Sequence, residues 1–199
     1  MIPTREDCFR LMLHCGMLGN IIDHSIEVAR VALFLSVELN RKGQKIDLSL
    51  VEAAALLHDL TKTECLRTKE DHAQTGSKLL KEMGYERIGD VVAEHIHLSK
   101  EMDPLRISEE EVVNYADKRV KHDQIVSLDE RFNDLKERYG QSQRALEHLE
   151  GLKQATFKIE KKIFSILGVD PHHLQGLLQE ASQRNGSEGE RDLSPSDNK

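Results

Sequence analysis

The sequence contains no tryptophan, and its aromatic content is only 4%. Only four prolines occur among 199 residues, so long stretches carry no residue that would break a helix. Leucine, alanine, glutamate and lysine dominate instead, and these residues favour helix over sheet. The length suits one domain that can bury a real core. We therefore predict an all-α fold.

Cysteine is also scarce. The three cysteines, Cys8, Cys15 and Cys65, are odd in number and form no CxxC spacing, which argues against a cysteine metal site. Cys8 and Cys15 lie seven residues apart, so on a helix they share one face and read as packing residues. No apolar run approaches the roughly 18 residues of a membrane span. The first residues also lack the pattern of a signal peptide. We expect no membrane association and a cytoplasmic location.

Positive charge is in deficit, because the formal net charge is −7. A general nucleic-acid binder needs a basic surface for its phosphate contacts, so the charge argues against that class. A locally basic pocket is compatible with this net charge.

Apolar residues at helical spacing mark most of the chain. In the segment 20–40 the repeat falls on Ile22, Ile26, Ala29, Leu33 and Val37. The other predicted helices are 4–15, 49–59, 71–83, 86–98, one beginning at 108, 121–138, 142–167 and a last one from Pro171 to about residue 182. Ser49 with Glu52 and Ser108 with Glu111 have the spacing of capping boxes. From residue 183 on, the polar composition predicts a disordered tail.

Polar side chains interrupt these apolar patterns in a recurring way. In "AAALLHDLTK" an apolar run ends in an imidazole and a carboxylate, which are costly to bury without partners. Together with similar positions elsewhere, the candidate metal ligands are His24, His58, Asp59, His72, His95 and Asp117. Imidazoles and carboxylates on helices are the inventory of a site for one or two divalent ions, with Asp59 as the natural bridge.

Two further histidines leave their roles open. His97 is two residues from His95, so on one helix the two side chains would point in roughly opposite directions. The apolar neighbours favour His95 as the ligand. His122 follows Asp117 closely, in "DKRVKHD", and could also contribute.

The ordered series of His, His-Asp, two spaced His and Asp resembles the HD superfamily of metal-dependent phosphohydrolases. It is closest to the branch whose doublet extends to His-Asp-x-x-Lys, often written HDIG; here it reads "HDLTK". "HAQTGSKLLKEMG" followed by "VVAEH" is similar to the family's fourth and fifth motifs. The resemblance covers roughly residues 20–125. It implies a compact helical core over 1–125. The residue pattern, not the resemblance, adds further helices over 126–182, which we expect to pack on the core, and a tail over 183–199.

The resemblance also implies an activity, the hydrolysis of a small phosphate ester such as a nucleotide or a related phosphoanhydride. The ions it implies are one or two of Mn, Fe, Co, Ni or Mg. Asp59 and Lys62 would act in catalysis, with the Lys62 ammonium on a phosphate oxygen. Arg119 and Lys121, in a basic patch after Asp117, are candidates for holding the substrate. No Gly-Tyr-Pro loop follows His95, which argues against cyclic di-GMP as substrate.

A different class of function stays open. A signalling or interaction module could keep this fold and lose turnover, and the long charged helices over 121–167 could pack on a partner or form a homodimer. The intact ligand set favours the enzyme, because without catalysis nothing would compensate six buried polar groups.

Overall fold

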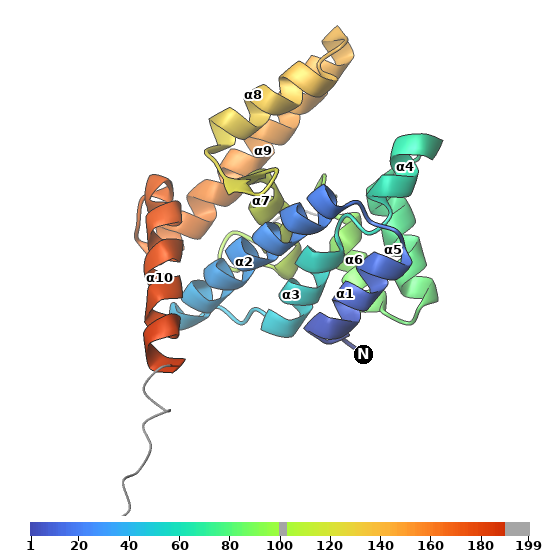
Figure 1. Cartoon of the computed structure of the whole chain (residues 1–199). Coiled ribbons are helices and arrows are strands. Elements are labelled where there is room, and N and C mark those ends of the chain that lie inside the picture. The colour runs from blue at the N-terminus through green and yellow to red at the C-terminus, as the bar shows by residue number, and fades with distance from the viewer. Residues whose placement is uncertain (100–102, 190–199) are drawn as a thin grey trace, which may run out of the picture. The chain divides into compact units, whose positions relative to one another are not determined.

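The structure, a computed structural model, describes residues 1–99 and 103–189. Its helices, labelled in Figure 1, are α1 (Arg5–His14), α2 (Gly19–Arg41), α3 (Leu48–Leu57), α4 (Lys62–Thr68), α5 (His72–Glu82), α6 (Glu86–Ala93), α7 (Glu109–Lys118), α8 (Leu128–Tyr139), α9 (Gln143–Leu167) and α10 (Leu174–Gly189). A short 3-10 turn, η1 (Pro171–His173), precedes α10. Apart from two antiparallel strands of two residues each, β1 (Val120–Lys121) and β2 (Gln124–Ile125), the described elements are helical. The predicted all-α class is confirmed.

Helix α3 is the centre of the bundle. It contacts α1, α2, α6 and α7, and its residues from Ala53 to Leu57 are all buried. A helix that is covered on every side needs apolar residues all round rather than one stripe, which explains the unbroken run before His58.

Helix α2 buries a different face from the one we predicted. Ala29 is buried as expected, but the other four positions of the predicted stripe are partly exposed. The buried positions include Ile21, Val28, Val31 and Leu35, because α2 is packed against both α3 and α7. His24 lies within this buried face, so its imidazole points into the core.

The N-terminal caps of two helices can be compared with the predicted capping boxes. Helix α7 begins as predicted, with Ser108 and Glu111 forming a capping box. The other capping box was wrong: α3 begins one residue after Asp47, whose side chain accepts the Leu50 N–H at 3.1 Å. Ser49 is instead an exposed residue inside the helix.

The predicted helix starting at 121 was wrong at its beginning. Val120 pairs with Ile125 in the β1–β2 hairpin, and His122 takes a left-handed backbone conformation with φ of 58°. Helix α8 starts only at Leu128. Two other boundaries differ as well, since α4 was not predicted and the helix expected over 86–98 ends at Ala93.

Helices α8 and α9 run side by side as a hairpin (Figure 1). Helix α9 also contacts α7 and α2. Two polar contacts join α9 to α7: the Tyr115 hydroxyl donates to Glu160 at 2.7 Å, and Lys162 pairs with Glu111 at 2.6 Å. The whole of Met1–Gly168 forms one compact unit. The predicted boundary at residue 125 stays a prediction.

A second unit begins at Val169 and contains η1 and α10. Helix α10 continues to Gly189, beyond the predicted end near residue 182. The remainder of the predicted tail, 190–199, lies outside the described residues. Across the described ranges, none of the helices combines the length and the apolar character that crossing a membrane requires.

Alanine substitutions at two glycines compare a tightly packed position of this bundle with an open one. A Cβ on Gly89 of α6 would lie 2.8 Å from the Ser77 carbonyl oxygen of α5, whereas one on Gly151 of α9 would meet open space. We expect Gly89→Ala to destabilise the protein by about 1–3 kcal/mol through overpacking. Gly151→Ala should stabilise it by up to about 1 kcal/mol through helix propensity. Thermal or urea unfolding measures both, and equal effects would contradict the close α5–α6 contact.

Candidate metal centre

The six predicted ligands come from five places in the fold and meet at one point. Helix α2 supplies His24, α5 begins with His72, and α7 carries Asp117 near its end. The remaining three, His58, Asp59 and His95, follow the C-terminal ends of α3 and α6. All are buried except His72, whose side chain is 23% exposed. The structure therefore brings the complete predicted set together.

Main-chain carbonyls orient the imidazoles that follow helix ends. The Nδ1 of His58 lies 2.7 Å from the Ala55 carbonyl oxygen, and the Nδ1 of His95 lies 2.7 Å from that of Val92. A carbonyl can only accept, so each Nδ1 carries a proton, and in the neutral imidazole the lone pair is on Nε2. The last carbonyls of a helix have no partner within it. These two helix ends use theirs to aim a histidine at the centre.

His24 is oriented by a carbonyl from another part of the chain. Its Nδ1 donates to the His122 carbonyl at 2.8 Å, and its Nε2 lies 3.0 Å from the Asp117 Oδ1. The left-handed backbone of His122 at the tip of the β1–β2 hairpin presents this carbonyl. His122 thus contributes through its main chain, which no side-chain pattern could have revealed.

The ligand atoms fall into two overlapping groups. One contains His24, His58 and Asp59, and the other contains Asp59, His72 and His95; within each group the atoms lie within 4.8 Å of one another. Asp59 belongs to both groups, as a bridging carboxylate would. Asp117 joins the first group, because its Oδ1 lies 3.6 Å from the His58 Nε2.

Each carboxylate is also held by a lysine. The Lys62 Nζ lies 2.6 Å from the Asp59 Oδ2, and the Lys118 Nζ lies 2.8 Å from the Asp117 Oδ2. Lys118 also donates to the His95 carbonyl at 2.7 Å. The other oxygen, Oδ1, faces His72 in the case of Asp59 and His24 in the case of Asp117, at 3.2 and 3.0 Å. Lys118 therefore fixes Asp117 through the oxygen that does not face His24, whereas Lys62 holds the Asp59 oxygen that also lies 3.4 Å from the His58 Nε2.

Unpaired buried atoms show that a cation fits this arrangement. The His58 Nε2 and the Asp59 Oδ1 are buried and make no hydrogen bond among the described residues, although the His72 Nε2 lies 3.2 Å from that oxygen. An unpaired buried acceptor costs roughly 1–3 kcal/mol. A divalent ion would satisfy both atoms, and nitrogen and carboxylate donors suit such ions.

The electrostatics of the ligands agree with a cationic centre. Burial by itself lowers the pKa of His58, but the carboxylates of Asp59 and Asp117 outweigh it and raise that pKa to about 9. Burial raises the pKa of Asp59, yet His58 and Lys62 hold it well below its usual range. Burial and the charge of His58 lower the pKa of His95. The carboxylates thus stabilise one added positive charge at the centre of the site, which is a proton on His58 or a bound cation. His95 stays neutral.

The predicted substrate-binding residues are placed less uniformly. Lys62 stands at the edge of the ligand cluster with 30% of its side chain exposed. Lys121 lies on the hairpin, with its Nζ 3.6 Å from the Asp134 Oδ1. Arg119 is buried, and its guanidinium donates to the Val126 carbonyl and the Tyr115 hydroxyl. Its role in holding a substrate stays a prediction.

The two competing histidines are now distinguished. His95 is buried in the cluster, whereas His97 is exposed. The reason differs from the predicted one, because α6 ends at Ala93 and the two residues do not share a helix. Lys118, which belongs with Arg119 and Lys121 to the basic patch after Asp117, pairs with the Asp117 carboxylate. Its place next to that carboxylate in the sequence was the available signal for this role.

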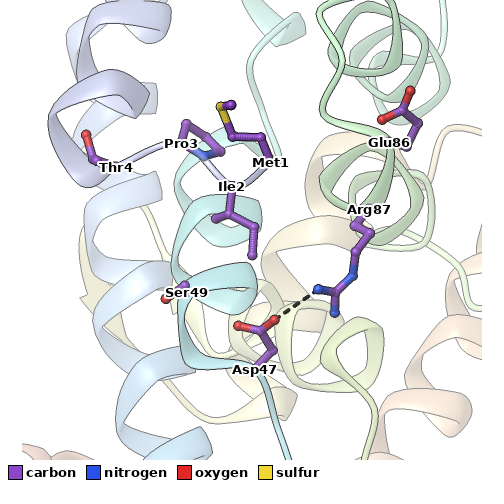
Figure 2. Close-up of a pocket in the computed structure, with 8 residues that line it drawn as sticks. All are labelled: Met1, Ile2, Pro3, Thr4, Asp47, Ser49, Glu86 and Arg87. Carbon is purple, nitrogen blue, oxygen red and sulfur yellow. Dashed lines mark hydrogen bonds and ion pairs between the residues drawn. The ribbon is translucent and has the colours of Figure 1, made fainter.

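A separate pocket lies at the opposite end of α3. Figure 2 shows its lining, which consists of residues 1–4, Asp47, Ser49, Glu86 and Arg87 around a hollow of about 570 Å³. The Arg87 guanidinium is paired with Asp47 at 3.0 Å. Asp47 precedes α3 and His58 follows it, so the pocket is roughly 15 Å from the metal centre along the helix. Its lining offers neither histidine nor cysteine as a ligand.

Comparison with known proteins adds independent information. A model of the HD domain family matches residues 21–128. Over 97 residues (48% of this chain), the sequence is 30% identical to a tRNA (cytidine(56)-2'-O)-methyltransferase of Thermoplasma volcanium. Over 62 residues (31% of this chain), it is 40% identical to Ribonuclease Y 1 of Pediococcus pentosaceus. These matches span 27% and 11% of the two relatives. No solved structure matches the chain significantly.

Because the Asp59 carboxylate belongs to both ligand groups, we predict that two ions bind. Since His72 belongs only to the second ligand group, His72→Ala should reduce the metal content from two ions per chain to about one. Elemental analysis of the purified protein after dialysis in excess metal measures this number. The exposed His97, changed to alanine, is the matched control and should keep both ions. A wild-type content that never exceeds one would contradict the two-ion arrangement.

Two substitutions of His122 distinguish the role of its backbone from that of its side chain. Glycine adopts φ near 58° without strain and keeps the carbonyl that accepts from His24, so His122→Gly should hold metal about as tightly as wild type. A β-branched residue resists this conformation. We expect His122→Val to weaken metal binding about tenfold, the lower end of the effect of losing such an orienting group. Competition with a chelator measures both affinities, and similar values for the two variants would refute the role of the carbonyl.

Proposed function

Because the chain belongs to the HD domain family, we propose that it is a divalent-metal-dependent phosphohydrolase that acts on a small phosphate ester, such as a nucleotide or a related phosphoanhydride. One observation carries the proposal: the six motif residues come together in a largely buried cluster, in which the His58 Nε2 and the Asp59 Oδ1 make no hydrogen bond among the described residues.

The residues that would hold the ions follow from the two ligand groups. His24, His58, Asp59 and Asp117 would surround one ion, while His72 and His95 would share Asp59 with a second. When bound, divalent ions in such sites polarise phosphoryl oxygens and lower the pKa of coordinated water. Ligands of these types accept Mn, Fe, Co, Ni or Mg.

Lys62 gives the chain its own means of acting on a phosphoryl group. Its side chain is partly exposed, and its ammonium is held 2.6 Å from the Asp59 Oδ2 at the edge of the ligand cluster. An ammonium in this position can donate to a phosphoryl oxygen while remaining paired with Asp59. It would offset the charge that develops on the equatorial oxygens during transfer.

A phosphodiester in RNA is the second candidate substrate, because one relative is named a ribonuclease and another a tRNA methyltransferase. The net charge of −7 favours the small substrate, since polynucleotides need an extended basic surface. An inactive interaction module is disfavoured by the two unpaired buried ligand atoms, which cost stability unless an ion is bound.

A screen of the metal-loaded protein tests the function itself. Phosphorylated metabolites, p-nitrophenyl phosphate and a short single-stranded RNA are each incubated with the protein. We expect phosphate release from the small esters, which stops after the metal is removed with a chelator and returns when it is added back. Cleavage of the RNA alone would favour the second candidate. No turnover of any compound by fully loaded protein would favour the interaction module.

Lys62→Ala tests the role of the chain's own cation. Loss of one charge-assisted contact to the reacting group should reduce kcat about 30- to 1000-fold, with the metal content unchanged. Lys78→Ala is the control, because that lysine is exposed on α5 and pairs only loosely with Glu82 at 4.0 Å; it should have no effect. Near-normal turnover in Lys62→Ala would remove Lys62 from the mechanism. Loss of metal would show instead that Lys62 acts by holding Asp59.

A further inference from the structure

A basic cluster outside the ligand set surrounds Asp134 on α8. Its carboxylate is buried and lies 3.3 Å from the Arg131 Nη1, 3.6 Å from the Lys121 Nζ and 3.1 Å from the Arg138 Nε. Three cations thus share one carboxylate, and these four side chains together carry two excess positive charges. On a chain with a net charge of −7, such a concentration of positive charge calls for an explanation.

Arg131 is the member of this cluster that has an unpaired N–H group. Only 10% of its side chain is exposed, and its Nε has no hydrogen-bond partner among the described residues. Its contact with Asp134, at 3.3 Å, is long for a charge-assisted hydrogen bond. A buried guanidinium with an unpaired N–H is costly, and an anionic oxygen would satisfy it.

The cluster adjoins the metal centre through the β1–β2 hairpin. The His122 carbonyl at its tip accepts from His24 at 2.8 Å, and the ring Nε2 of the same residue lies 3.1 Å from the Arg138 Nη2. Lys121, the preceding residue of the hairpin, pairs with the same Asp134 carboxylate as Arg131. The hairpin that orients a ligand histidine therefore also contacts the basic cluster.

We propose that Arg131, flanked by Lys121 and Arg138, binds a second phosphoryl group of the substrate while the first is held at the metal centre. This inference rests on the proposed function for the reacting phosphoryl group and narrows the substrate class to organic phosphates with at least two phosphoryl groups, such as nucleoside diphosphates. A guanidinium suits the role, since its planar N–H groups match two oxygens of a phosphate. Asp134 would keep its contacts with Lys121 and Arg138 if Arg131 turned to the ligand.

The affinities for two nucleotides, one with a single phosphoryl group and one with two, test the contribution of the second phosphoryl group. The probes are AMP and α,β-methylene-ADP, whose bridging carbon resists hydrolysis, measured by calorimetry on the metal-loaded full chain. Wild type should bind the diphosphate analogue at least about tenfold more tightly than AMP, because it gains charge-assisted contacts. Arg131→Gln should weaken binding of the analogue about tenfold or more and should change that of AMP less than about twofold.

Lys136→Gln is the matched control. It removes one positive charge from the same helix, but Lys136 pairs with Glu150 of α9 at 3.0 Å and lies outside the Asp134 cluster. It should leave both affinities unchanged. Arg138→Gln, at an exposed position, provides a second variant if Arg131→Gln does not fold; it should weaken binding of the analogue about threefold, again with little effect on AMP.

Three results would overturn the proposal: no preference for the analogue in wild type, equal losses for both nucleotides in Arg131→Gln, or an equal effect of Lys136→Gln. Hydrolysis of p-nitrophenyl phosphate by wild type, an ester with a single phosphoryl group, reports on the proposed function separately. If that hydrolysis is absent while the analogue still binds through Arg131, the anion site stands and the phosphohydrolase fails. If hydrolysis is present and Arg131→Gln has no selective effect, the reverse holds.

Discussion

The buried carboxylate of Asp59 is the constraint on which the rest of the structure depends. One side chain lies within reach of His58, His72 and His95 and also pairs with Lys62. A carboxylate taken out of water is stable only when positive charge or hydrogen bonds replace its hydration. The bundle meets this requirement because residues on or directly after helices α2, α3, α5, α6 and α7 come together at one point. The same charge requirement that organises the fold makes the centre suitable for divalent ions.

The fold uses helix ends as the means of aiming ligands. His58 and His95 both follow the last turn of a helix and donate to a carbonyl three residues earlier, so the free acceptor of the helix end becomes the orienting group. This arrangement explains why a polar pair follows directly on the most apolar segment of the chain. The helix needs its apolar residues for burial on every side, and the site needs its C-terminal carbonyls. Both requirements fall on the same ten residues of α3.

Charge is distributed unevenly between the surface and the site. The chain is acidic overall, yet Lys62, Lys118, Lys121, Arg131 and Arg138 gather around the metal centre and the adjoining hairpin. Basic groups focused in one region of an acidic molecule concentrate small anions there and disfavour long polyanions elsewhere. Such a pattern agrees with the proposed small phosphorylated substrate, and it assigns different tasks to neighbouring cations. Lys118 fixes a ligand, Lys62 stands at the edge, and Arg131 offers an unpaired donor.

The sequence by itself determined the helical class, most helix positions and the six residues that come together in the His and Asp cluster, because amphipathic spacing, capping residues and polar interruptions of apolar runs are local signals. It did not determine the β1–β2 hairpin, since two-residue strands leave no periodicity. It also missed the buried face of α2, which depends on how many neighbours surround that helix. Main-chain contributions such as the His122 carbonyl are invisible in side-chain identity. The different surroundings of Arg119 and Arg131 were likewise decided by the tertiary structure. Both are arginines among charged neighbours in the sequence, and only packing decides that the first is enclosed by Tyr115 and Glu160 while the second keeps an unpaired N–H beside Asp134.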